Sequence, residues 1–168
     1  GAVIGSEESS RMAFAKAQIS AGAELPTSGT LVATVNDSDK PMATTILRRF
    51  HDLGFKILAT EGTRRYLRAR GVPAERVFKV GEGRPNIVDH IISGGVDLLI
   101  NTPLGKQSQY DDYAMRRAAV TYKVPYCTTL SAAAAACEAV LALRSRSRDV
   151  RCLQERFSQD AALSTIQA

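Results

Sequence analysis

The stretch KILATEGTRRYLRARG, residues 56–71, decides the fold class of this chain. The apolar run 57–59 predicts a strand, and residues 60–63 predict a tight turn. Residues 63–70 then have the pattern of a short helix, which Gly71 ends. A helix that begins directly after a strand can hold a phosphate, because its first N–H groups point outward. The stretch therefore predicts a strand–turn–helix unit with an anion-binding turn.

The rest of the 168-residue chain repeats this alternation. Strands are predicted at 30–35, 55–60, 76–80, 96–102 and 124–128. Helices are predicted around 42–53, 63–70, 87–92 and 110–122, and Ser131 is expected to cap a last, alanine-rich helix that runs to about Ser145. Strands that alternate with helices predict a parallel sheet that is covered on both faces. The expected fold is a Rossmann-like, three-layer α/β/α sandwich with about five parallel strands.

Composition excludes several classes of protein. Hydrophobic residues make up 45% of the chain and charged residues 23%, which is typical of a globular protein. The sequence has no run of 18 apolar residues, so we expect no membrane partner. The N-terminus lacks the basic and apolar regions of a secretion signal, and we therefore expect a cytoplasmic protein.

Cysteine, histidine and arginine residues bear on metal and nucleic-acid binding. The three cysteines have unpatterned spacings and are interpreted as reduced thiols, while His51 and His90 lie too far apart in the sequence for a metal site. Five arginines against two acids between residues 144 and 156 allow a nucleic-acid arm. No aromatic residue is interleaved with those arginines before Phe157, so a solvated helix end is favoured.

Polar and cationic residues gather where the predicted strands end. In parallel sheets the ligand binds beyond the carboxyl ends of the strands. The candidates there are hydroxyls, one amide, four cations and three glycines, namely Thr34, Thr60, Thr63, Thr102, Thr128, Thr129, Asn101, Lys40, Lys79, Arg84, Lys106, Gly62, Gly81 and Gly83. Each has a plainer interpretation, since Thr60 and Thr63 can cap a helix, Lys79 can be solvated, and Asn101 can hydrogen-bond a turn instead of a ligand. Their convergence at one sheet edge favours a site for a phosphomonoester.

Two familiar nucleotide motifs are absent. Residues 81–86 begin like the dinucleotide pattern GxGxxG but end in Asn86, and Pro85 lacks an N–H group. Gln107 stands where a Walker A motif needs Ser or Thr. No pair of carboxylates falls clearly at the strand ends, so we expect no catalytic residue in this chain.

Four segments together resemble a known family. TEGT (60–63), KVGEGRPNIVD (79–89), LLINTPLGK (98–106) and YKVPYCTTLSAA (122–133) are similar to the methylglyoxal-synthase-like domain at the C-terminus of carbamoyl-phosphate synthetase large subunits. MAFAKAQISAG (12–22) resembles the segment that joins this domain to the preceding ATP-grasp half. The resemblance implies a linker over residues 1–28, a regulatory domain over 29–145 and a basic tail over 146–168.

The resemblance also implies a function. Domains of this family perform no chemistry and need no cofactor; they bind allosteric effectors, namely UMP as inhibitor, IMP as a weak ligand, or N-acetylglutamate in the urea-cycle enzyme. The parent enzyme uses ATP with Mg or Mn to make carbamoyl phosphate for pyrimidine and arginine biosynthesis, and works with a glutaminase small subunit. The implied effector residues are Lys40, Thr60, Gly62, Thr63, Lys79, Asn101 and Thr102, with Thr34, Arg84, Thr128 and Thr129 as a secondary set.

The chain departs from the family pattern at several positions. Pro103 replaces a frequent second threonine, which removes one hydroxyl near the nucleotide. Cys127 replaces an aspartate that helps ornithine activation. The superfamily also contains methylglyoxal synthase, a lyase whose catalytic aspartate would fall at Arg84 or Pro85, where neither residue can act as a base. A stand-alone phosphate-binding module and this lyase are the two alternatives to a regulatory domain.

Overall fold

A computed structural model describes residues 23–103 and 109–166 of the chain, and these residues form a five-stranded sheet in the order β3-β2-β1-β4-β5. Every strand pair is parallel. The strands are β1 (Thr30–Thr34), β2 (Lys56–Ala59), β3 (Glu75–Arg76), β4 (Leu98–Asn101) and β5 (Tyr126–Cys127). The helices are α2 (Lys40–Asp52), α3 (Glu61–Ala69), α4 (Ile87–Ile92), α5 (Gln109–Thr121) and α6 (Leu130–Ile166). The predicted parallel α/β fold is confirmed.

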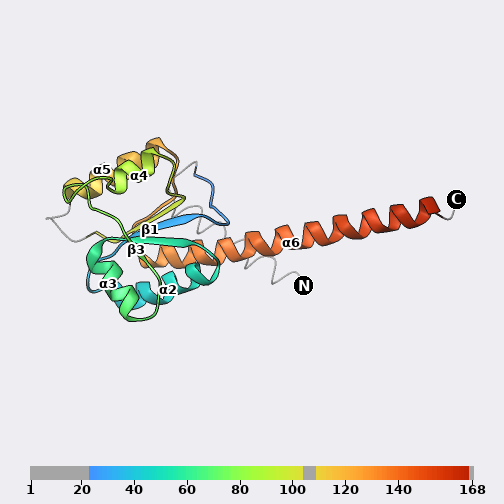
Figure 1. The fold of residues 1–168 in the computed structure, drawn as a ribbon, viewed down its shortest axis with the longest axis horizontal. Helices are drawn as coiled ribbons and strands as arrows, with labels where there is room; N and C mark the ends of the chain where they lie inside the picture. The colour runs from blue at the N-terminus through green and yellow to red at the C-terminus, as the bar shows by residue number, and fades with distance from the viewer. Residues whose placement is uncertain (1–22, 104–108, 167–168) are drawn as a thin grey trace.

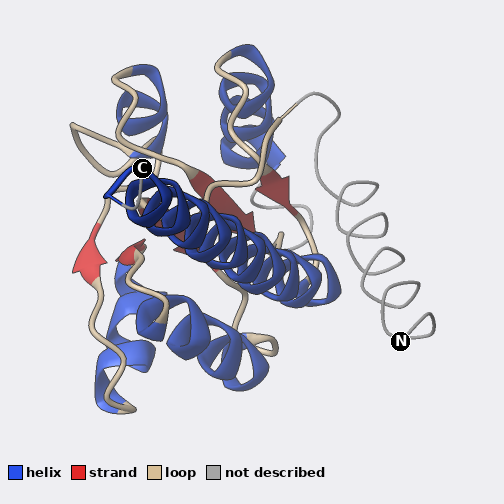
Figure 2. Ribbon diagram, turned by 90° about the vertical axis from the view of Figure 1, so that its right-hand side faces the viewer, coloured by secondary structure: helices blue, strands red, loops and turns tan. Residues whose placement is uncertain are grey.

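Helices cover both faces of the sheet (Figures 1 and 2). Alternate residues of β1 point to opposite faces, because successive side chains of a strand do so. Leu31 and Ala33 join one core cluster with α2 and α6, whereas Val32 joins a second cluster with α4 and α5. β1 pairs with both β2 and β4, so it lies in the middle of the sheet and is buried from both sides.

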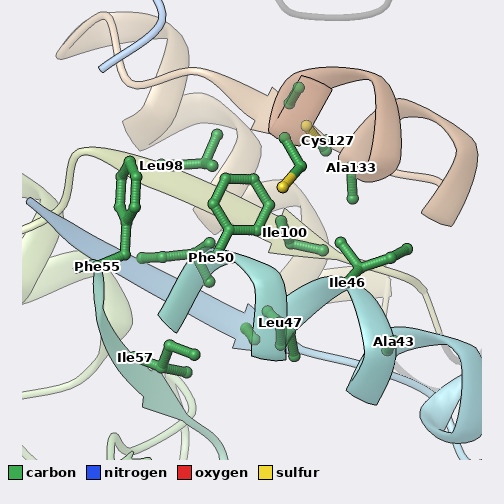
Figure 3. Packing of buried hydrophobic residues seen from close by; sticks show 14 of the residues in the cluster. Ala43, Ile46, Leu47, Phe50, Phe55, Ile57, Leu98, Ile100, Cys127 and Ala133 are labelled. Atoms are coloured by element: carbon green, nitrogen blue, oxygen red, sulfur yellow. The ribbon is translucent and has the colours of Figure 1, made fainter. Parts of the chain in front are cut away.

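The first core cluster is built around Phe50 of α2 (Figure 3). Phe50 is fully buried, and its ring meets the ring of Phe55 edge to face, with centroids 5.3 Å apart. Such aromatic pairs add stability beyond the area they bury. Leu98 and Ile100 of β4 bring the sheet into the same cluster. This packing holds α2 on the sheet and thereby fixes the position of its first residue, Lys40.

Several predicted limits differ from the structure, and β5, for example, has two residues where five were predicted. β3 has two residues where five were predicted, because a turn in which the Glu82 N–H binds the Lys79 carbonyl (3.1 Å) takes over the end of that run. The predicted cap of the last helix was wrong, since the Thr129 hydroxyl, and not Ser131, accepts the Ala132 N–H (3.1 Å). The predicted end of that helix near Ser145 was also wrong. α6 continues to Ile166, because no glycine or proline follows to interrupt it.

Residues 1–22, which make up most of the predicted linker, and residues 104–108, which include Lys106, lie outside the described residues. In the part of the chain that the structure describes, no helix is both long enough and apolar enough to cross a membrane. Within the same residues, no group of three or more His, Cys, Asp or Glu side chains is placed to hold a metal ion.

Candidate anion-binding site

The carboxyl ends of β1, β2 and β4 meet at one edge of the sheet. The register aligns Thr34 with Asn101 and Ala33 with Ala59, so that Thr60 follows directly beside them. Five uncharged polar residues at this edge are buried, namely Thr34, Thr60, Thr63, Asn101 and Thr102. Buried polar side chains need partners, and the partners at this edge define what the site can still bind.

Thr60 and Thr63 do not cap α3 as the plainer interpretation expected. Thr60 occupies the N-cap position, but its side chain makes no capping hydrogen bond. The Thr63 hydroxyl accepts the Val35 N–H (3.2 Å) and lies 3.5 Å from the Thr60 hydroxyl. The two threonines therefore tie the loop after β1 to the start of α3, while the N-cap side chain leaves the first N–H groups of α3 uncapped.

Lys40 brings a positive charge to the start of α3. Its ammonium lies 3.3 Å from the point where a Cβ on Gly62 would stand, and its side chain is only 13% exposed. The same ammonium pairs with the exposed carboxylate of Asp37. Gly62 thus leaves room for the Lys40 ammonium beside the positive end of a helix, which is an arrangement that attracts an anion.

Lys79 adds a second positive charge near this point. The pKa of Asp37 is lowered mainly by the hydrogen bond and the charge of Lys40, and Lys79 lowers it further through its charge. Lys79 also lines a narrow pocket together with Thr34, Asn101 and Thr102. The structure therefore brings cations from two different segments to one edge of the sheet, and the charges of both act on the Asp37 carboxylate.

Asn101 has a structural role at this edge of the sheet. Its amide donates to the Asp112 carboxylate (2.8 Å) and to the Tyr126 hydroxyl (2.9 Å). Burial raises the pKa of Tyr126, and the hydrogen bond from Asn101 acts in the opposite direction. The sequence left open whether Asn101 holds a turn or a ligand, and both amide hydrogens now serve to tie β4 to α5 and β5.

Thr102 supports the neighbouring loop. Its hydroxyl accepts the Asn36 N–H at 3.0 Å, and its own N–H binds the Thr34 carbonyl at 3.0 Å. These bonds fix the backbone between β1 and Asp37. Thr102 therefore contributes to the candidate site in two ways. It lines the pocket, and it supports the loop that carries Asp37, the ion-pair partner of Lys40.

Arg84 and Thr129, two of the secondary candidates, have other partners. Arg84 binds Asp89 through two bonds, from Nη2 to Oδ1 at 2.6 Å and from Nε to Oδ2 at 3.2 Å. Thr129 caps α6, as described above. Thr128 is half-buried just after β5, and within the described residues it is not among those that line the pocket of Lys79. Thr34 is the secondary candidate that the structure does bring to that pocket.

Sequence reasoning missed several residues at this edge. Asp37 carries a detectable signal, because it stands three residues before Lys40, a spacing at which opposite charges meet when the chain turns. Asp111, which lines the pocket with Lys79, sits in the first turn of α5 and looks like an ordinary helix-start acid. Tyr126 gives no signal in the sequence, since it reaches Asn101 across 25 positions of the chain.

The ion pair of Arg84 and Asp89 makes a pH-dependent prediction. Asp89 closes a capping box with Asn86, and the hydrogen bonds from Arg84 and from the Asn86 backbone lower its pKa to about 2. A carboxylate whose pKa is lowered in the folded state stabilises the fold when the pH is above its ordinary pKa of 3.8. This contribution is lost as the pH falls toward the folded-state pKa of about 2. The difference in melting temperature between the wild-type chain and Asp89→Asn should therefore shrink between pH 4 and pH 2.5, as followed by circular dichroism. A difference that stays constant over this range would show that the carboxylate charge does not matter.

Comparison with known proteins places these residues in context. Residues 43–128 match the family model of the MGS-like domain. The chain is 49% identical over 155 residues to a carbamoyl phosphate synthase large chain of Gemmatimonas aurantiaca, covering 92% of this chain and 14% of that protein. It is 49% identical over 156 residues to the C-terminal section of the same large chain in Methanopyrus kandleri, covering 92% and 29% respectively. The corresponding section in Aquifex aeolicus is 44% identical over 163 residues, with 94% and 30% covered. The chain thus spans less than a third of each of these relatives.

Proposed function

Since the chain belongs to the MGS-like domain family, we propose that it is the effector-binding domain of a carbamoyl phosphate synthase large chain and senses a nucleoside monophosphate such as UMP or IMP without transforming it. The observation that supports this most is the position of the Lys40 ammonium beside Gly62 at the uncapped start of α3. Two lysines and a helix N-terminus at one sheet edge provide what a phosphate dianion needs.

The phosphate would take over a role that Asp37 fills in its absence. Asp37 is highly exposed and therefore exchanges easily with another anion, whereas the Lys40 side chain is largely covered. A phosphate at the start of α3 would accept hydrogen bonds from the first N–H groups of the helix and from the Lys40 ammonium. Lys79, in the pocket with Thr34 and Thr102, would add its charge, which already acts on Asp37.

Two acids near this edge, Glu61 and Asp89, support binding over catalysis. Glu61 pairs with Arg64 and Arg65, and the hydrogen bond from Arg65 is the largest cause of its lowered pKa. Asp89 is held by Arg84. Carboxylates with lowered pKa values are poor bases at neutral pH, because they hold a proton too weakly. We therefore expect no methylglyoxal to form from dihydroxyacetone phosphate, and clear turnover in that assay would overturn the regulatory assignment in favour of the lyase.

Within the whole protein the domain would act through other parts of the large chain. We propose that residues 1–28 link it to the preceding ATP-grasp half, that residues 29–145 form the regulatory domain, and that the glutaminase subunit and the ATP sites, with Mg or Mn, lie outside this chain in a cytoplasmic enzyme. An effector shifts distant sites only by its different affinity for two states, which is typically worth about 1–3 kcal/mol. Residues 146–166, interpreted from the sequence as a tail, continue the helix α6.

Ornithine is expected to be a weak effector or none. Cys127, which stands where the family often has aspartate, is fully buried in the first core cluster, and burial raises the pKa of its thiol to about 12. A neutral buried thiol cannot replace a carboxylate in binding an ammonium group. Thr128 keeps its hydroxyl but carries no charge.

Calorimetric titration of the chain with UMP, IMP, ornithine and N-acetylglutamate tests the proposal. We expect heat of binding with UMP or IMP, and weaker or no binding of ornithine. Binding of UMP or IMP should lose affinity as salt is added, because the phosphate contact is electrostatic. If none of the four compounds binds, the effector-site proposal fails. A gene that encodes only a single domain would instead support the stand-alone module.

Gly62→Ala is expected to weaken nucleotide binding about 3- to 10-fold while leaving the fold intact. The added Cβ would stand 3.3 Å from the Lys40 ammonium and would move it by a few tenths of an ångström. Alanine is a better helix former than glycine by about 0.8–1.0 kcal/mol, so thermal stability should stay the same or rise. Gly81→Ala is the matched control, since its Cβ would meet no atom within 4 Å. Equal affinities in both variants would remove Gly62 from the site.

A further inference from the structure

The second half of α6 extends away from the body of the domain (Figure 1). Residues 145–159 of this helix are exposed throughout. Most helices in proteins owe their stability to tertiary packing of an apolar face, and isolated helices of this length are marginal in water. We define residues 145–159 as the overhang of α6. A helix of this kind is expected to pack against another surface.

The overhang carries an apolar stripe. Val150, Leu153 and Phe157 are 54%, 53% and 72% exposed and stand at i, i+3 and i+7, so they share one side of the helix. The stripe continues a seven-residue repeat from the buried part of α6, in which Ala136, Leu143, Val150 and Phe157 form one line and Ala132, Ala139, Arg146 and Leu153 the other. Ala132, Ala136 and Ala139 are buried in the core of the domain. A repeat of 3.5 residues per turn is the pattern by which two helices pack side by side.

The charges beside the stripe select the partner. Asp149 and Arg156 stand seven residues apart, and therefore on the same flank of the stripe. In the part of the chain that the structure describes, neither of them makes an ion pair or a side-chain hydrogen bond. A second overhang that runs antiparallel, centred near Leu153, would place Asp149 of each copy beside Arg156 of the other. In a parallel pair the flanks that carry Asp149 and Arg156 lie on opposite sides of the stripe, so these two residues do not meet across the pair.

We propose that the overhang of α6 pairs with the overhang of a second copy of this chain, antiparallel and around a two-fold axis near Leu153. The three apolar side chains of each stripe then cover each other, and two Asp149–Arg156 ion pairs flank them. A two-fold axis makes the interface self-complementary, which is the usual arrangement of a homodimer. The pairing lies away from the candidate anion site and does not depend on the proposed function.

Sedimentation velocity of the whole chain over a range of concentrations tests this pairing. We expect a monomer–dimer equilibrium in the wild-type chain, weakened about 10- to 100-fold by Val150→Glu, because a charge would enter the covered stripe. Val120→Glu is the matched control, since Val120 is a similarly exposed valine (61%) on α5, and it should leave the equilibrium unchanged. Circular dichroism checks that both variants keep the fold. A wild-type chain that remains monomeric at all concentrations would overturn the proposal.

A charge exchange tests the antiparallel direction. Asp149→Arg and Arg156→Asp should each weaken the dimer, because each places like charges beside one another in the partner. The double variant restores opposite charges across the axis and should regain most of the wild-type association. Within one helix the two residues lie two turns apart and do not touch, so recovery can arise only between copies. If Arg156→Asp strengthens association, or the double variant stays weak, the antiparallel pairing is wrong, and binding of the stripe to another part of the synthase or to nucleic acid takes its place.

Discussion

Lys40→Met is expected to weaken the binding of UMP or IMP about 10- to 100-fold, because it removes a charged hydrogen-bond donor worth about 1.5–3 kcal/mol. Methionine keeps the length and the apolar stem of the side chain, so the packing around Gly62 should survive. The loss should be smaller at high salt, where the charge of Lys40 contributes less to the wild-type affinity.

The same substitution should not reduce stability. Lys40 is the first residue of α2, where a helix disfavours positive charge by about 0.3–1 kcal/mol, and the ion pair that the substitution removes is with the highly exposed carboxylate of Asp37, where solvent weakens it. Removal of a merely structural ion pair would instead lower the melting temperature. A melting temperature that stays the same or rises, together with a loss of affinity, is the signature of a residue kept for ligand binding.

Lys56→Met is the matched control for this experiment. Lys56 lies at the beginning of β2, at the opposite edge of the sheet, and pairs with Glu75 at 3.0 Å. The substitution removes the same charge from the chain without touching the candidate site. Equal loss of affinity in Lys40→Met and Lys56→Met would mean that only net charge matters, and unchanged affinity in Lys40→Met would remove this residue from the site.

Phe50→Ala is expected to lower the free energy of unfolding by about 3–5 kcal/mol, the usual cost of deleting a fully buried phenylalanine. Phe50 packs against Phe55 and joins α2 to the sheet, so its loss leaves a cavity that these rigid elements cannot fill by small shifts (Figure 3). Chemical denaturation followed by circular dichroism measures the change as a shift of the midpoint at a constant slope.

Phe157→Ala provides the comparison for Phe50→Ala. Phe157 is the same residue type on the exposed overhang, and its replacement should change the stability of the domain by less than about 0.5 kcal/mol at concentrations where the chain is monomeric. A loss below about 1 kcal/mol in Phe50→Ala would contradict the central place of this ring in the core. The pair of variants also separates the stability of the body from that of the overhang.

Much of the fold could be predicted from the sequence. The apolar run 57–59 and the helical spacing after it report burial within each element, and such local patterns predict a strand or a helix without knowledge of its neighbours. The parallel sheet then follows, because strands joined through helices run in the same direction. For the same reason, the sequence was enough to show that Lys40, Thr60 and Lys79 follow predicted strands or loops.

Elements whose limits depend on neighbouring contacts were predicted less well. β3 is short because a turn with Glu82 competes with the strand, and the sequence alone does not rank these two outcomes. Thr129 and Ser131 are both good helix caps, and only the position of β5 decides that Thr129 is used. The extension of α6 beyond Ser145 follows from the absence of a helix breaker, although residues 145–159 are exposed throughout.

The sequence by itself determined the class of fold, the order of its elements and the kind of residue at each strand end, because these are recorded in local periodicity and composition. Only the tertiary structure decided which of those residues meet. Lys40 lies beside Gly62, and Asn101 reaches Tyr126, because the strand order β3-β2-β1-β4-β5 places segments 20 to 25 residues apart at one edge. Contacts of this kind depend on strand order and register, which many sequences with the same local pattern could satisfy in different ways.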